Sequence, residues 1–338
     1  MTMFQSQSDA SFNFTDESSF GHFMTGLRAL RRYSEETERD QPNRDLLTQN
    51  LARAYDNLNY CVTNYPDDFV PLYSLGLVLT MKNQFIYAQA LADRNAQAEA
   101  AHAAQLGPPA PRPWPLLDHA ADLFERAMHG SVMLAEAARF NLAHVYAKRD
   151  NGTDGVGDLN RALELLHAFS ASVGSVPPAG RRQLGWFRSE REQMRERDYH
   201  ALRFQVSILT LFVQTRRAFR DNPESIERSV GTVQQRIACE REEIAQSALP
   251  PPIKADLLAD SSTKMGYLSY EAAMALPNGT EEKRSELLAE AQSELGQALL
   301  RKPNWNPPQI YMAQVLQALG RFEEARANLK AVLGNGTS

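Results

Sequence analysis

Apolar residues recur at three- and four-residue steps along most of the chain, and this spacing predicts α-helices. The pattern begins with Phe20, Phe23, Met24, Leu27 and Leu30. A first helix is expected to end near Asp40, before Pro42, and the next one to begin at about Asn43. No segment shows the alternation typical of a strand, so we expect an all-α fold of roughly eleven to fourteen helices.

A set of small and large residues repeats inside this helical pattern. Near the C-terminus the set is Ala291, Leu295 and Ala298, and it returns 34 residues later as Ala325, Leu329 and Val332. Similar sets occur earlier in the chain at Ala54, Leu58 and Cys61 and at Ala120, Phe124 and Ala127. Small residues let two helix backbones approach, and a large residue fills the gap between them. We therefore predict that these positions and Gly76 are buried, and that Cys61 is a structural thiol.

The 34-residue period, together with the segment PLYSLGLVL around Gly76, resembles the tetratricopeptide repeat (TPR) family. Ala88 follows Gly76 by twelve residues, which is the register of the second helix of such a hairpin. The resemblance implies an α-solenoid of helical hairpins, and a scaffold or adaptor whose concave face binds a peptide or helix of another protein. On the matching positions, that face comprises Tyr73, Leu77, Phe140, Asn141, His144, Lys148, Tyr311, Gln314 and Gln317.

The repeat pattern is absent from the middle of the chain. Two long helices are expected there instead, from about Arg181 to Arg220 and from Pro223 to Ala248. The second carries an apolar seam of Ile226, Val230, Val233, Ile237 and Ile244. The predicted order is a mobile tail at 1–17, a TPR-like array at 18–175 with a Pro-rich connector at 107–115, a long-helix insertion at 176–252, TPR-like hairpins at 253–333 and a tail at 334–338.

Charge leaves two interpretations of the middle segment open. The chain has a net charge of −5, yet residues 181–220 contain ten Arg against four acidic residues. Arg216, Arg217 and Arg220 near a helix C-terminus suit the helix dipole, which is a structural role. They also suit an acidic partner, and the alternative function is then a regulator that responds to a ligand or nucleic acid through this helix.

Candidate chemistry is sparse. The two cysteines, Cys61 and Cys239, form no C-x-x-C pair, and the seven histidines show no metal-ligand spacing, so we expect neither an enzyme nor a cofactor or metal. The loop RDNGTDGVGD has acidic residues at calcium-loop spacing, but Arg161 stands where the bidentate Glu belongs. Without an apolar run long enough for a signal or a membrane span, we expect a cytoplasmic protein. Its predicted partner is another protein, within a larger complex or alone, and nucleic acid stays open.

Overall fold

The computed structural model describes residues 17–39, 41–100, 115–149, 156–175, 190–222, 226–277 and 280–334. These residues form twelve helices and no strand, which confirms the all-α prediction for the described part of the chain. The helices divide into two compact units. One unit holds α1 to α5 with α11 and α12, and the other holds α6 to α10. Outside the described residues lie most of the predicted tail at 1–17, most of the connector at 107–115 and the acidic loop at 150–155. The start of the long helix predicted from Arg181 and most of the predicted tail at 334–338 also lie outside them.

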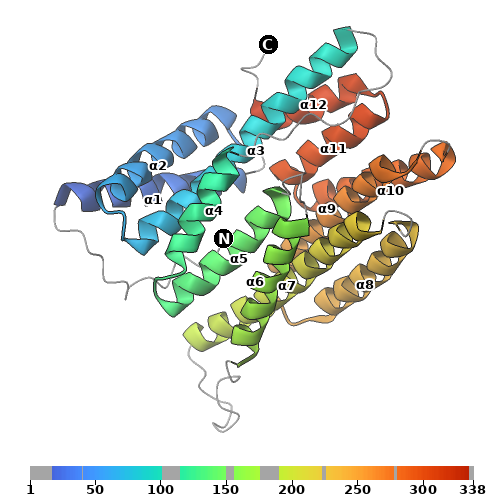
Figure 1. Ribbon diagram of the computed structural model, residues 1–338. Helices are drawn as coiled ribbons and strands as arrows, with labels where there is room; N and C mark the ends of the chain where they lie inside the picture. The colour runs from blue at the N-terminus through green and yellow to red at the C-terminus, as the bar shows by residue number, and fades with distance from the viewer. Residues whose placement is uncertain are drawn as a thin grey trace. The chain divides into compact units, whose positions relative to one another are not determined.

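In the first unit, α1 to α5 each pack on the next helix in sequence. The unit consists of α1 (Glu17–Thr37), α2 (Arg44–Asn64), α3 (Phe69–Ala100), α4 (Pro115–Ala127), α5 (Val132–Arg149), α11 (Asn306–Ala318) and α12 (Phe322–Leu333). The C-terminal pair α11 and α12 pack on each other and on α3, as Figure 1 shows. Two pieces of chain far apart in sequence therefore share one unit.

The repeat residues explain how these helices pair. Ala54, Leu58, Cys61, Ala120, Phe124, Ala127, Ala291, Leu295, Ala298, Ala325 and Leu329 are all 0–1% exposed, and Gly76 is buried as well. A Cβ added to Gly76 would lie 2.8 Å from the ring of Phe124, so a larger residue there would have to displace the ring where α3 packs on α4. Likewise, a Cβ added to Gly26 on α1 would lie 2.8 Å from the side chain of Leu58 on α2. Cys61 is buried as predicted, with its Sγ 3.7 Å from the carbonyl oxygen of Ser19.

One predicted hairpin is absent. The register of Gly76 and Ala88 implied a turn between two helices, but α3 continues unbroken from Phe69 to Ala100. The segment after Gly76 contains neither Gly nor Pro and is rich in Ala, Leu and Gln, which favour continued helix. Gly76 therefore packs against Phe124 on α4, the helix that follows α3 in sequence, and not against a second helix near Ala88.

The second unit contains α6 (Val156–Ser175), α7 (Glu190–Asp221), α8 (Ile226–Gln246), α9 (Pro251–Ala275) and α10 (Glu281–Arg301). The two long helices predicted for the middle of the chain correspond to α7 and α8, and the whole apolar seam of α8 is buried. Helix α9 packs on α7, α8 and α10. At its crossing with α10, a Cβ on Gly266 would lie 2.7 Å from Leu295. The Gly-to-large contact thus occurs in both units.

Helices α2 and α10 differ in how their starts are capped. Asn43 caps α2, because its side-chain oxygen accepts hydrogen bonds from the backbone N–H groups of Asp45 at 3.1 Å and Leu46 at 3.2 Å. Thr280 stands at the start of α10 but does not cap it, since its hydroxyl donates to the carbonyl oxygen of Pro277 at 2.7 Å.

Candidate interaction surface

Several residues that the sequence assigned to a binding groove lie on one face of α3 or donate hydrogen bonds to it. At about 100° per residue, the side chains of Tyr73, Leu77, Tyr87, Leu91 and Asn95 point to the same side of this helix. We call these five residues the α3 row. Its N-terminal half faces α5, and its C-terminal half faces α11 and α12. Residues predicted from three separate hairpins therefore meet along a single helix.

The N-terminal half of the row is held by a hydrogen bond to α5. The side-chain Nδ2 of Asn141 donates to the hydroxyl oxygen of Tyr73 at 3.1 Å. The ring of Tyr73, which is only 7% exposed, also lies 5.7 Å from that of Phe124. Burial raises the pKa of Tyr73 to about 12, and the bond from Asn141 acts weakly in the opposite direction. Tyr73 is therefore a neutral structural contact more than an open groove residue.

Partly exposed side chains flank this contact. Phe140 and His144 lie one turn apart on α5, and their rings meet edge to face at a centroid distance of 4.8 Å. Leu77 on α3 and Lys148 on α5 are also half-buried. These four residues are the accessible part of the predicted face on α3 and α5. They provide one aliphatic side chain, two aromatic rings and one cation. We call them the α3–α5 patch.

The C-terminal half of the row is covered by the C-terminal hairpin. Gln314 donates from Nε2 to the hydroxyl oxygen of Tyr87 at 2.5 Å, and Gln317 donates to the carbonyl oxygen of Leu91 at 3.0 Å. These glutamines are 4% and 5% exposed. The prediction that Gln314 and Gln317 line an open groove is wrong, because α11 packs on α3 and both amides are buried in that contact. Tyr311, on the same helix, is half-buried.

The entry to the hairpin is fixed by the connection between α1 and α2. Arg44 donates from Nη1 to Oδ1 of Asn306 at 3.0 Å, and Asn304 donates to the carbonyl oxygen of Arg39 at 2.8 Å. Tyr33, which is buried beside Arg44, has its pKa raised to about 12 by desolvation, while the cation acts in the opposite direction. Burial likewise lowers the pKa of Arg44. This end of the hairpin is thus tied to the α1–α2 connection by one part-buried and one exposed hydrogen bond.

Within the described residues, Arg216, Arg217 and Arg220 do not form the predicted acidic-partner patch together. Arg216 is 2% exposed, and its Nε and Nη2 each donate to Glu271 at 2.6 Å. Its guanidinium also lies 5.5 Å from the ring centroids of Phe212 and Tyr267. Arg217 pairs with Asp221 at 3.2 Å on the surface, and Arg220 is exposed. Arg216 therefore belongs to the interior of its unit, and the patch loses its first member.

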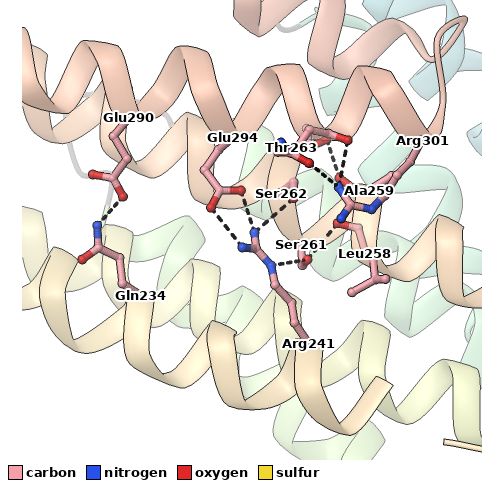
Figure 2. Close-up of polar contacts among 11 residues, drawn as sticks. Gln234, Arg241, Leu258, Ala259, Ser261, Ser262, Thr263, Glu290, Glu294 and Arg301 are labelled. Carbon is pink, nitrogen blue, oxygen red and sulfur yellow. Dashed lines mark hydrogen bonds and ion pairs between the residues drawn. The ribbon is translucent and has the colours of Figure 1, made fainter. Parts of the chain in front are cut away.

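A second polar network, drawn in Figure 2, joins three helices of the α6–α10 unit. Arg241 on α8 donates to both carboxylate oxygens of Glu294 on α10, at 2.9 and 2.7 Å. The same guanidinium donates to the hydroxyls of Ser261 at 3.0 Å and Ser262 at 3.2 Å on α9. The Arg241 and Glu294 side chains are 27% and 19% exposed, so the network lies at the edge of the interior. Sequence analysis did not find it, because its members come from three helices without a shared motif.

Ser261 and Lys264 have the S-x-x-K spacing of some serine hydrolases, and their arrangement excludes that pairing here. The hydroxyl of Ser261 donates to the carbonyl oxygen of Leu258 at 2.9 Å and accepts from Arg241. Lys264 pairs with Asp260, one turn before it on α9. Neither group is directed to the other as nucleophile and base.

Other chemistry is not evident in the described residues. Within them, no three His, Cys, Asp or Glu side chains are grouped so that they can hold a metal ion. No helix in the same part of the chain has the length and apolar character needed to cross a membrane. No model of a known protein family matches this sequence, and no curated protein is significantly similar to it.

Proposed function

We propose that the protein is a non-enzymatic scaffold or adaptor of the TPR type, which binds a peptide or helix of another protein. The observation that carries this proposal is the Gly-to-large crossing, which occurs at Gly26 with Leu58, Gly76 with Phe124 and Gly266 with Leu295. A contact repeated in three helical pairs is typical of a stack of hairpins, and such stacks serve mainly as binding surfaces.

The α3–α5 patch is the part of this surface that we assign to the partner. Phe140 and His144 supply aromatic contact area, Leu77 supplies an apolar neighbour and Lys148 a cation. Binding energy at interfaces concentrates in a few such anchors. A partner segment with one apolar or aromatic side chain and a nearby acidic group fits this combination.

The alternative, a ligand- or nucleic-acid-responsive regulator acting through the Arg-rich helix 181–220, has less support at Arg216. Nε and Nη2 of Arg216 both donate to Glu271, and its guanidinium lies 5.5 Å from the ring centroids of Phe212 and Tyr267. Freeing it for an acidic ligand means breaking a buried ion pair, at a cost of roughly 3–5 kcal/mol. We therefore place the binding function on α3 and α5.

The test is a comparison of captured proteins rather than capture alone. Tagged wild-type chain, Phe140→Ala and Ile86→Ala are each incubated with lysate of the source cells, and bound proteins are quantified by mass spectrometry. Ile86 is the matched control, since it is a 44%-exposed apolar residue on α3 outside the patch. A partner retained by Ile86→Ala but lost from Phe140→Ala supports the proposal. Equal capture by both variants contradicts it.

A further inference from the structure

The C-terminal hairpin completes a unit from which it is distant in sequence. Helices α11 and α12 pack on α3, whereas the chain that leads into them comes from α10 in the other unit. Only residues 302–305 separate the end of α10 at Arg301 from the start of α11 at Asn306. The hairpin is thus a terminal element with a short connection, and this is the kind of element that copies of a protein exchange.

Side-chain amides make the contact between the hairpin and α3. Gln314 bonds to Tyr87, Gln317 to the backbone at Leu91, and Asn95 donates to the carbonyl oxygen of Phe322 at 3.1 Å. These bonds recur at every turn of α3 from Tyr87 onward, because their α3 members are spaced four residues apart. The contact therefore specifies one register of α11 and α12 along α3.

The same contact also contains two buried amide oxygens without a hydrogen-bond partner, Oδ1 of Asn95 and Oε1 of Gln314. Asn95 is 1% exposed and Gln314 is 4% exposed. An unsatisfied buried acceptor disfavours the closed contact, and water satisfies it when the contact opens. The hairpin's own interior is apolar, with Leu316, Ala325 and Leu329 buried. Opening of the contact with α3 therefore lets water satisfy the two acceptors, Oδ1 of Asn95 and Oε1 of Gln314.

We propose that the C-terminal half of the α3 row is a docking site for the α11–α12 hairpin of a second copy of this chain, which takes the place of the chain's own hairpin. The exchanged dimer reproduces every contact of the closed monomer, so exchange costs no side-chain bonds. Residues 302–305 are the hinge. This site lies beyond the α3–α5 patch and does not depend on the proposed partner.

The first measurement uses a labelled peptide of residues 303–334 as the probe, with full-length chain as the receptor. Gln317→Ala in the chain weakens its own hairpin while α3 and the probe stay wild type. Fluorescence anisotropy should show this variant binding the probe roughly tenfold more tightly than the wild-type chain does. Gln297→Ala, the same change at an exposed glutamine of α10, should bind like wild type. Gln314→Ala is the second variant, and circular dichroism checks that each chain stays folded.

The second measurement is sedimentation of the wild-type chain over a range of concentrations. A dimer should form and should return to monomer when unlabelled peptide 303–334 is added in excess. No gain of probe binding in either glutamine variant contradicts the proposal, as does a chain that stays monomeric. A dimer that survives excess peptide contradicts it too, because such a dimer uses another surface. Phe140→Ala should change neither result, which separates this site from the α3–α5 patch.

Discussion

Gly76 on α3 lies against the ring of Phe124 on α4, so closely that a Cβ at Gly76 would come within 2.8 Å of Cε1. The ring of Phe124 is fully buried and has little room to move. This contact sets the distance between two helices, and α3 in turn carries both α5 and the C-terminal hairpin.

Gly76→Ala should therefore destabilise the protein, by about 1–3 kcal/mol as for overpacked cores. Gly296→Ala is the matched control on α10, where nothing lies within 4 Å of the added Cβ. That change should stabilise the helix by up to about 1 kcal/mol through propensity alone. Urea unfolding measures the free energy of unfolding of both variants and so tests this difference. Similar stabilities for the two variants would mean that the crossing at Gly76 is looser than described.

Arg216 should be important for stability, not for binding. Arg216→Gln leaves Glu271 without its two bonds at 2.6 Å and should cost about 3–5 kcal/mol of unfolding free energy. Arg217→Gln removes only an exposed pair with Asp221 and should change stability by less than about 1 kcal/mol. Thermal melts of the two variants measure the difference. Equal melting temperatures would contradict the burial of Arg216.

The buried tyrosines predict an alkaline limit to stability. The pKa of Tyr33 rises in the folded state from 10.0 to about 12, so the folded protein holds the phenol proton more tightly than the unfolded chain. The stabilisation is fully present below pH 10 and is lost as the pH rises toward 12. A two-unit shift corresponds to about 2–3 kcal/mol.

Tyr33→Phe provides the test of this limit. The variant should lose stability less steeply than wild type between pH 10 and 12, when unfolding free energy is measured by urea titration at each pH. Tyr60→Phe, at a position that is 40% exposed, is the control and should follow the wild-type curve. A Tyr33→Phe curve parallel to wild type would show that this phenol contributes nothing to the alkaline loss.

Local pattern was sufficient to predict several features of the fold. Helical spacing predicted α7 and α8 and the burial of Ile226 to Ile244 along one seam. The small and large residues of the repeat sets identified buried positions, because burial of those side chains follows from helix packing. Asn43 was placed correctly at the start of α2 because capping is a local interaction.

Features that depend on distant contacts were not predictable. The amides of Gln314 and Gln317 are polar in sequence, and only the packing of α11 on α3 turns them inward. Arg216 resembled its neighbour Arg217 until the position of Glu271 distinguished them. The unbroken α3 was also not predicted, because the repeat register implied a turn between Gly76 and Ala88 that the helix-favouring residues of this segment do not form.

The central claim is that a partner protein binds at the α3–α5 patch. Hydrogen exchange of the full chain, measured with and without the partner recovered by the capture comparison, tests it most directly. We predict slower backbone exchange around Leu77 on α3 and from Phe140 to Lys148 on α5, with α7 and α8 unchanged. Protection confined to α7 and α8, with none on α3 or α5, would contradict the account.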